Sequence, residues 1–224
     1  MLRLRHLAVS SVVVCLVACE GPEQSLLNRF FTAVQQGNED AVAAMSLASF
    51  PGEVQSWEVV EVGAESSEAF RLAELRREAA DAKGDLDFQL EKNALFLQDN
   101  QSTYDRYKAR HDKDPDYEFK GKLAEFQEEW EKRLKQQRAL ERKAEETNEA
   151  AKKERQAARM SINQGVTDSL SGDVVTKEVT VKVNDGSADK IYVFTLRRYK
   201  LVDRERNITP MTRWIIADIQ ERGV

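Results

Sequence analysis

The order of hydrophobic and polar positions changes along the chain, and each change marks a different kind of predicted structure. After Gly21 and Pro22, apolar residues recur at helical spacing until Gly37. These positions are Leu26, Leu27, Phe30, Phe31 and Val34. The pattern predicts an amphipathic helix over about residues 23–36, followed by a shorter helix that Asn38 caps.

A strand is predicted after these helices. The second helix is expected to end before Pro51 and Gly52. Residues 54–62 then contain Trp57, Val59, Val60 and Val62 without glycine or proline, which is typical of a strand.

Residues 66–164 have a different composition, in which charges of both signs alternate with Ala, Leu and Gln and favour helix. The run 111–116 interrupts them, and Asp114 is placed to cap a new helix whose first residue is the following proline. We therefore predict an inserted helical hairpin with arms over 66–110 and 115–164. At 1.5 Å per residue each arm would be roughly 65 to 75 Å long, and near-equal arms return the chain to its starting point.

Both predicted arms carry apolar seams with heptad-like spacing. The first seam runs through Leu72, Leu75, Ala79, Ala82, Leu86, Leu90 and Leu97, and the second through Leu123, Phe126, Trp130, Leu134, Leu140, Ala144, Ala151 and Ala158. Gly84 and residues 100–102 favour a bend or a third helix. Phe88, Leu95 and Phe96 lie off the seam, which indicates burial against the rest of the protein or a second copy.

Trp130 and Phe126 are candidate partner-contact residues on the second arm. They share one helical face, and we expect Trp130 to pack against the first arm. The alternative is that Trp130 is exposed as an anchor for another protein.

The period changes to two after Gly165. Val179, Val181 and Val183 alternate with polar residues, and a turn signal at 184–186 precedes a second strand over 191–199. Residues 213–219 form a last predicted strand, which is apolar on both faces and is therefore expected at the centre of its sheet.

The amino terminus has the features of a secretory signal. Arg3 and Arg5 precede an apolar run over residues 7–18, which is too short to span a bilayer. The run ends in Leu16-Val17-Ala18-Cys19, which resembles the lipobox of bacterial lipoproteins. That resemblance implies removal of residues 1–18, a lipid thioether on Cys19 and fatty acylation such as palmitate. It also implies anchoring to the inner or outer membrane of a bacterial cell envelope.

Cysteine content and charge limit the disulfides and the partners that the mature chain is expected to have. Cys15 lies in the predicted signal peptide and Cys19 would be lipidated, so the mature chain would form no disulfide. The chain has 39 acidic and 34 basic residues and a formal net charge of −5. This balance offers no electrostatic reason to expect nucleic acid as a partner.

The order of elements predicts an α+β protein and resembles the nuclear-transport-factor-2-like cone fold. Residues 29–45, with Phe-Phe-Thr-Ala-Val-Gln-Gln-Gly-Asn-Glu-Asp-Ala-Val, and 214–219 carry the resemblance. The implied fold is a curved antiparallel sheet on amino-terminal helices, with residues 19–65 and 165–224 forming one domain of undefined function. The hairpin at 66–164 departs from that family, which puts any function carried over from compact relatives in doubt.

The sequence offers little for catalysis, so we expect no enzyme, cofactor or metal. His111 is the one histidine outside the predicted signal peptide, and a solvated turn explains it. Asp112, Asp114 and Asp116 resemble the start of a calcium loop, but Tyr117 and Leu123 stand where that loop needs glycine and glutamate.

Five residues are candidates for lining a pocket inside a cone-like domain: Trp57, Tyr192, Tyr199, Trp214 and Asp218. Core packing is the alternative role for the aromatic residues. Strict alternation puts Asp218 on the same face as Trp214 and Ile216, where burial would raise its pKa, whereas its place near the chain end favours solvent exposure.

The leading hypothesis is a non-enzymatic, lipid-anchored envelope protein that uses residues 66–164 to bind a protein partner or a second copy. A periplasmic chaperone-like holder of client proteins is one rival, and it requires exposed apolar surface inside the arm. A small-ligand-binding or enzymatic cone-fold domain is the other, and it requires a polar residue buried in a cavity.

Overall fold

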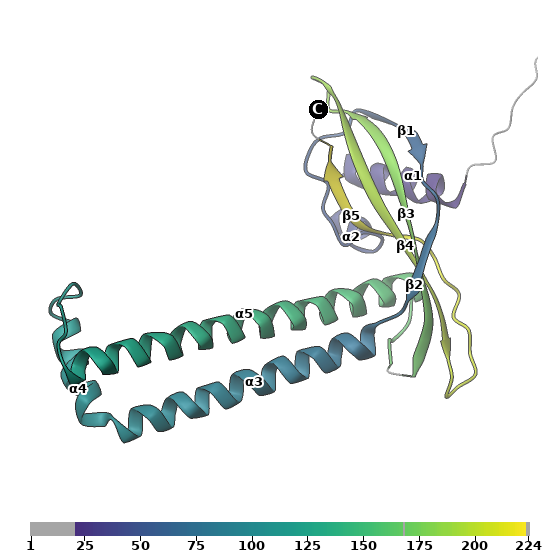
Figure 1. Ribbon diagram of the computed structural model, residues 1–224. Helices are drawn as coiled ribbons and strands as arrows, with labels where there is room; N and C mark the ends of the chain where they lie inside the picture. The colour runs from purple at the N-terminus through teal and green to yellow at the C-terminus, as the bar shows by residue number, and fades with distance from the viewer. Residues whose placement is uncertain (1–20, 168, 223–224) are drawn as a thin grey trace, which may run out of the picture.

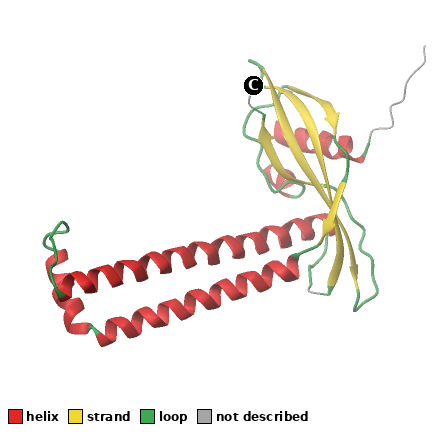
Figure 2. Ribbon diagram, in the orientation of Figure 1, coloured by secondary structure: helices red, strands yellow, loops and turns green. Residues whose placement is uncertain are grey.

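The computed structural model describes residues 21–222 except residue 168, and in this part it shows an α+β protein with a five-stranded antiparallel sheet and two long projecting helices (Figures 1 and 2). The strands are β1 (Ser56–Val62), β2 (Ser66–Ala69), β3 (Leu170–Asn184), β4 (Asp189–Asp203) and β5 (Ile215–Glu221). Their order is β1-β3-β4-β5, and β2 pairs with β3 beyond the end of β1.

Two helices precede the sheet, as predicted. Helix α1 (Pro22–Gln35) buries Leu26, Leu27, Phe30 and Phe31. Gly37 then adopts a positive φ of 63°, which a side chain would disfavour. Helix α2 (Glu39–Ala43) begins where the Asn38 side chain accepts a hydrogen bond from the Ala41 N–H, which confirms the predicted cap.

The predicted hairpin after Gly165 is also confirmed. Strands β3 and β4 pair along their whole length, and residues 185–188 form the turn between them. The Asp185 carboxylate accepts hydrogen bonds from the Ser187 hydroxyl and from the Ser187 and Ala188 N–H groups, which lowers the pKa of Asp185.

The sheet carries a separate hydrophobic core on each face. Val174 and Val175 are neighbours in β3, so their side chains point to opposite faces, and each belongs to a different core. The first core packs α1 against Val175, Val179, Val181, Val183, Tyr192, Phe194, Leu196 and Trp214. The second packs Leu72, Ala157, Ala158 and Ile162 against Val174, Tyr199 and Leu201.

The predicted central position of the last strand is wrong, because β5 is at the edge of the sheet. Its free side is covered by residues 45–47, where the Ile216 N–H donates to the Met45 carbonyl and the Leu47 N–H to the Ile216 carbonyl. Ile215 and Ile216 lie in different cores. The strand is therefore apolar on both faces because each face covers its own core, not because the strand is central.

The predicted start of the helical region at Ser66 is also wrong. Residues 66–69 form β2, whose four residues are all exposed and which is held by backbone pairing with β3. Residues 66–69 lack the apolar alternation that would predict a strand. Their polar composition therefore could not be distinguished from that of the helix that follows. Helix α3 (Leu72–Asp99) begins three residues later than β2 ends.

The long helices form an arm, which we define as residues 72–162. Helix α3 packs along α5 (Lys122–Ile162), and the short α4 (Gln101–His111) joins them at the distal end (Figure 1). The break at 100–102 thus introduces the additional helix α4. The 41 residues of α5 correspond to about 60 Å at 1.5 Å per residue.

The predicted cap at Asp114 and Pro115 is wrong, because α5 begins only at Lys122, after Gly121. Residues 112–121 instead form a loop, in which the Asp114 carboxylate accepts from the Asp116 N–H. This loop buries Phe119 against Tyr107, with 5.0 Å between ring centroids. Burial of an aromatic ring therefore outweighs the local signal for a helix start.

Candidate functional site

Helices α3 and α5 contact each other along a seam. In the middle of the arm, the residues of this seam differ from the predicted ones. On α3 the buried positions continue from Ala82 to Gln89 and Asn93, whereas Leu90 is 41% exposed. The Gln89 amide donates to Asn93 (2.9 Å), and the Asn93 amide donates across the seam to Gln137 of α5 (2.9 Å). A polar layer inside a helix pair fixes the register of the helices at some cost in stability.

An aromatic cluster closes the distal half of the arm. Phe126 is buried and stacks on Phe96, with 5.4 Å between ring centroids. Trp130 is half-buried, parallel to Phe96 at 6.2 Å and edge-on to Tyr104 at 6.3 Å. The structure thus places both candidate contact residues between the helices, with part of the Trp130 ring still open to solvent.

The proximal end of the arm is joined to the sheet by an ion-pair bridge. Arg197 of β4 contacts Glu154 of α5 at 2.9 Å and Glu68 of β2 at 3.2 Å. Tyr199 is buried beside this bridge, and its burial together with the Glu154 charge raises the tyrosine pKa. The bridge therefore holds β2, β4 and the end of α5 together.

Hydrogen bonds around Ser161 reinforce the same joint. The Ser161 hydroxyl accepts from the Tyr199 N–H at 3.1 Å and donates to the Arg213 carbonyl at 2.7 Å. The Arg213 guanidinium donates to the Met160 and Ala44 carbonyls. The end of α5 is therefore fixed to β4, to the segment before β5 and to the end of α2, which holds the arm in one direction.

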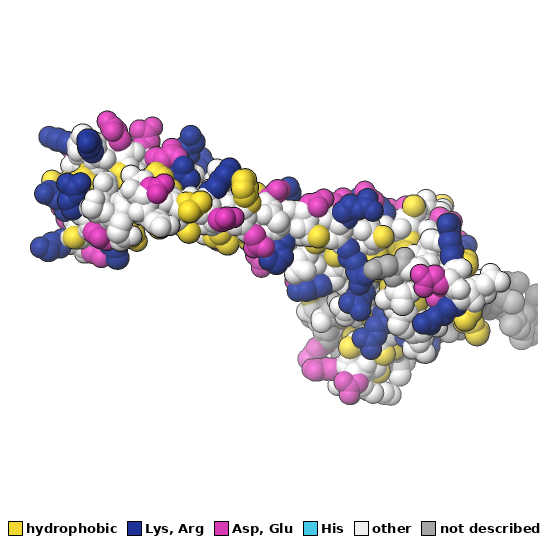
Figure 3. All heavy atoms as spheres, turned by 90° about the horizontal axis from the view of Figure 1, so that it is seen from below, with side chains coloured by type: hydrophobic (Ala, Val, Ile, Leu, Met, Phe, Trp, Pro, Cys, Tyr) yellow, Lys and Arg dark blue, Asp and Glu magenta, His cyan; other side chains and the backbone are white. Residues whose placement is uncertain are grey.

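The outer surface of α3 is apolar part-way along the arm. Phe88 is 58% exposed and Leu95 is 53% exposed. The Lys92 ammonium lies over the Phe88 ring, 4.2 Å from its centroid. Figure 3 shows hydrophobic side chains reaching the surface of the arm among charges of both signs. Phe88 and Leu95 thus lie off the seam, as predicted, but they are not buried against the rest of the described chain, and Phe96 lies in the seam itself.

The five candidate pocket residues do not converge on one cavity. Trp57 stacks on Phe31 at 4.7 Å, and Tyr192 packs on Phe50 at 4.8 Å, both within the first core. Tyr199 belongs to the second core, on the opposite face of the sheet.

Asp218 lies apart from these aromatic residues. A bulge in β5 pairs Ile216 with Leu196 but Asp218 with Thr195, so Asp218 faces away from the first core. The prediction that Asp218 shares a face with Ile216 is therefore wrong. Asp218 is half-buried and accepts a hydrogen bond from the Gln220 amide at 2.6 Å.

Trp214 is part of a charged cluster that sequence reasoning missed. Lys177 lies 5.3 Å and Arg198 4.6 Å from its ring centroid. Lys177 also bridges Glu65 at 3.3 Å and Glu23 at 3.6 Å. The sequence does mark this cluster, because Lys177 occupies a position of β3 on the same face as the apolar residues Val175 and Val179. This cluster joins the start of α1 to the sheet.

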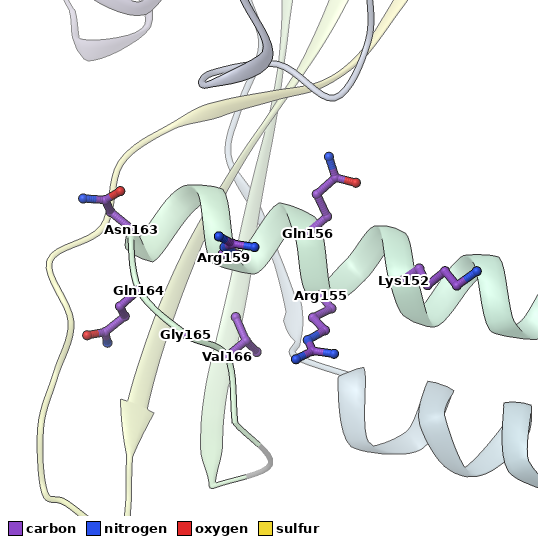
Figure 4. Close-up of a pocket in the computed structure, with 8 residues that line it drawn as sticks. All are labelled: Lys152, Arg155, Gln156, Arg159, Asn163, Gln164, Gly165 and Val166. Atoms are coloured by element: carbon purple, nitrogen blue, oxygen red, sulfur yellow. The ribbon is translucent and has the colours of Figure 1, made fainter. Parts of the chain in front are cut away.

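An open basic groove of about 730 Å³ follows the last turns of α5 and the segment after it (Figure 4). Its described lining includes Lys152, Arg155, Arg159 and Asn163, and contains no carboxylate. Figure 3 also shows blue Lys and Arg side chains gathered near the junction of the arm and the sheet. Positive charge at a helix carboxyl end offsets the helix dipole, which gives this groove a structural role.

Several expectations concern groups outside these sites. Cys19 and the predicted lipobox lie outside the described residues. Within residues 21–222, apart from 168, no group of three acidic, His or Cys side chains is arranged to hold a metal ion. No helix in the described part of the chain is long and apolar enough to cross a membrane.

Comparison with known proteins assigns no family. No protein-family model matches the chain, and no curated protein or solved structure matches it.

Proposed function

We propose that this chain is a non-enzymatic, lipid-anchored protein of the bacterial cell envelope that presents the arm as a surface for protein contact. The observation that carries the proposal is the combination of a fixed joint and an exposed apolar face. Arg197, Glu154 and Ser161 hold the arm to the sheet, while Phe88 and Leu95 remain exposed. Exposed apolar patches on an otherwise charged surface are typical of interaction sites.

The length of the arm supports the same role. An arm of this kind orders many residues but shields little of the two sheet cores, which involve it only near its proximal end. The polar layer and the distal aromatic cluster stabilise the arm by itself. An arm stabilised in this way can hold a contact surface at a fixed distance from the sheet domain.

The anchor is proposed from the resemblance of residues 16–19 to a lipobox. Helix α1 begins at Pro22, three residues after the proposed lipidated Cys19. A lipid there would hold the sheet domain close to the membrane surface, and the arm would extend from that domain. Inner and outer membranes are both compatible with this arrangement.

A cone-like fold related to nuclear transport factor 2 remains our proposal for the domain formed by residues 19–65 and 165–224, with the arm as an insertion. Support comes from α1 and α2, which precede the sheet and pack on one face of it. The Arg197 bridge links β2 and the end of α5 to the rest of the sheet domain, which supports an insertion shorter than residues 66–164.

The residues that were predicted to support the two rival functions do not come together as those functions require. A client holder needs apolar surface inside the arm, but Ala82, Phe126 and the polar layer fill the inner seam. An enzyme or small-ligand binder needs a polar group in a cavity, but the five candidate residues are divided between cores and surface.

Shortening the arm tests the proposal. Removing residues 83–96 and 133–146 deletes two heptads from each helix, preserves the phase of the seam and retains the joint at Glu154 and Ser161. In cells treated with a cross-linker, the full chain should form specific protein adducts that the shortened chain loses, while both remain membrane-bound and folded. Equal adduct patterns for both chains would contradict the proposal.

A further inference from the structure

Residues 200–211, at the end of β4 and in the loop that leads to β5, expose apolar side chains. Met211 is 93% exposed, Ile208 50% and Val202 39%. A bridge between Asp203 and Ile208 closes the turn after β4, so Val202 and Ile208 lie at the same end of the sheet. Apolar side chains that are grouped in this way gain free energy when a partner removes them from water.

The exposed charges of this segment are mainly positive. Lys200 and Arg204 are exposed and have no ion pair within the part of the chain that the structure describes, and Arg206 lies 3.8 Å from Asp203. Asp203 is buried and accepts hydrogen bonds from the N–H groups of the turn, so Glu205 is the exposed carboxylate of the segment. This surface is therefore locally basic, although the whole chain has a formal net charge of −5.

The alternation of β4 places part of this surface on the side opposite to the arm. Phe194 and Leu196 belong to the first core, and Lys200 and Val202 continue the same alternation, so they lie on the face that α1 covers. Asp173 of β3 lies opposite Lys200 on this face. Helix α5 packs in the second core, on the other face. In Figure 1 the loop between β4 and β5 and the start of α1 lie on the right, and the arm extends to the left.

The start of α1 lies near this surface. Glu23 contacts Lys177 of β3 at 3.6 Å, and Lys177 is paired with Leu196 of β4. Val202 follows six residues later on β4, which corresponds to about 20 Å. Helix α1 begins three residues after the proposed lipid on Cys19, so its start would be held within about 11 Å of the bilayer.

We propose that residues 200–211 contact the anionic surface of the bilayer that holds the lipid, with Ile208 and Met211 in the interface and Lys200 and Arg204 at the phosphate groups. Segments that lie in a membrane interface combine apolar side chains with cations in this way. The inference rests on the proposed function, because it requires the lipid anchor. A lipid alone leaves the sheet domain free to tilt, whereas a second contact about 20 Å away limits the tilt and directs the arm away from the bilayer.

A fluorescent probe in the full, lipidated chain tests both the contact and the direction of the arm. The protein is reconstituted in vesicles of equal parts phosphatidylcholine and phosphatidylglycerol, with a nitrobenzoxadiazole probe on Thr209→Cys or on Ala94→Cys of α3, two exposed positions. A lipid with a nitroxide on its acyl chain should quench the probe at position 209 several-fold more than the probe on the arm, because an interfacial segment lies within about 10 Å of the acyl chains. Equal quenching at both positions, or none at either, would overturn the proposal.

Apolar variants in the Thr209→Cys background test the inserted residues. Ile208→Asp combined with Met211→Asp should lower the quenching to the level of the probe on the arm. Phe88→Asp combined with Leu95→Asp is the matched control, because it removes two exposed apolar side chains from the arm and should leave the quenching unchanged. Unchanged quenching in the Ile208 and Met211 variant, with the circular dichroism of the parent, would overturn the proposal.

Charge variants in the same background test the lipid chemistry. Lys200→Gln and Arg204→Gln should each shift the contact away from vesicles that contain phosphatidylglycerol by about fivefold. In vesicles of phosphatidylcholine alone the two variants should match their parent. Equal quenching of variants and parent in the phosphatidylglycerol vesicles would overturn the assignment of an anionic lipid surface.

Labelling of the wild type separates this inference from the proposed function. If Cys15 is removed and Cys19 is lipidated, the wild type takes up no thiol probe and stays on the vesicles. A labelled wild type that is released from the vesicles means that the anchor, and with it the proposed function, fails. An unlabelled, bound wild type without quenching at position 209 means that only the bilayer contact fails. Protein adducts from a photoreactive group at position 209 in cells, without quenching in vesicles, would identify a protein as the occupant and overturn the proposal.

Discussion

Tyr199 shows how one buried hydroxyl makes the sheet domain sensitive to alkaline pH. Burial and the neighbouring Glu154 charge raise its pKa above the usual 10.0. Above pH 10 the phenol of the unfolded chain loses its proton while the folded one keeps it, so the unfolded state binds fewer protons and stability falls as pH rises. Below pH 10 both phenols are neutral and this loss is absent.

We predict that Tyr199→Phe makes the sheet domain less sensitive to high pH. At neutral pH the variant should be about as stable as the wild type, because the buried Tyr199 hydroxyl gains little from the neighbouring Glu154 carboxylate. Between pH 10 and 11 the wild type should lose up to about 1.4 kcal/mol more than the variant. Denaturant unfolding at each pH measures this difference, and parallel curves for the two proteins would refute it.

Trp130 contributes to the stability of the distal arm through Phe96 and Tyr104. A fully buried tryptophan costs about 3 to 5 kcal/mol on truncation, so the half-buried Trp130 should cost about 2 kcal/mol. Trp130→Ala is expected to lower arm helicity and protease resistance without changing the melt of the sheet domain. Unaltered helicity with loss of a bound protein would instead identify Trp130 as a contact residue.

At the level of elements, the sequence predicted what is local and missed what tertiary packing decides. The helix around Phe30, the Asn38 cap and the hairpin turn at Asp185 follow from short-range patterns and are confirmed. Strand β2 was missed because backbone pairing with β3 stabilises it, and its own side chains carry no pattern. The start of α5 was misplaced because Phe119 is buried by a loop.

The candidate site was predicted in the same partial way. The off-seam positions of Phe88 and Leu95 were recognised from the apolar pattern, but that pattern indicated burial and the two side chains are exposed in the described chain. Gln89 and Asn93 were missed because the seam was followed through leucines, and a polar layer has no apolar signal. The bulge that turns Asp218 outward cannot be read from a strict alternation of residues.

The polar layer leads to a prediction for the arm as an element. Asn93→Leu removes the acceptor of the buried Gln89 amide and the donor to the half-buried Gln137 oxygen, and leaving the buried Gln89 amide unpaired costs about 1 to 3 kcal/mol. The matched triple variant with leucine at Gln89, Asn93 and Gln137 removes all three amides and should be more stable than Asn93→Leu. Thermal melts followed at 222 nm rank the three proteins, and a single variant as stable as the wild type would argue against the layer.

At the level of the whole molecule, membrane attachment depends on the proposed anchor at Cys19. A serine hydroxyl cannot form the thioether, so Cys19→Ser should abolish incorporation of a labelled fatty acid and release the protein from the membrane fraction. Cys15→Ser is the matched control and should keep full labelling. Wild-type labelling of Cys19→Ser would remove the lipoprotein interpretation.

The central claim is that the outer face of the arm contacts protein in the cell. A photoreactive phenylalanine analogue placed at Leu95 or at Leu90 compares two exposed positions on different sides of α3 in the membrane-bound full chain. Illumination of living cells should give discrete protein adducts from position 95, with a second copy or another protein, and none from position 90. Absence of adducts at position 95, or the same adducts at both positions, would contradict the account.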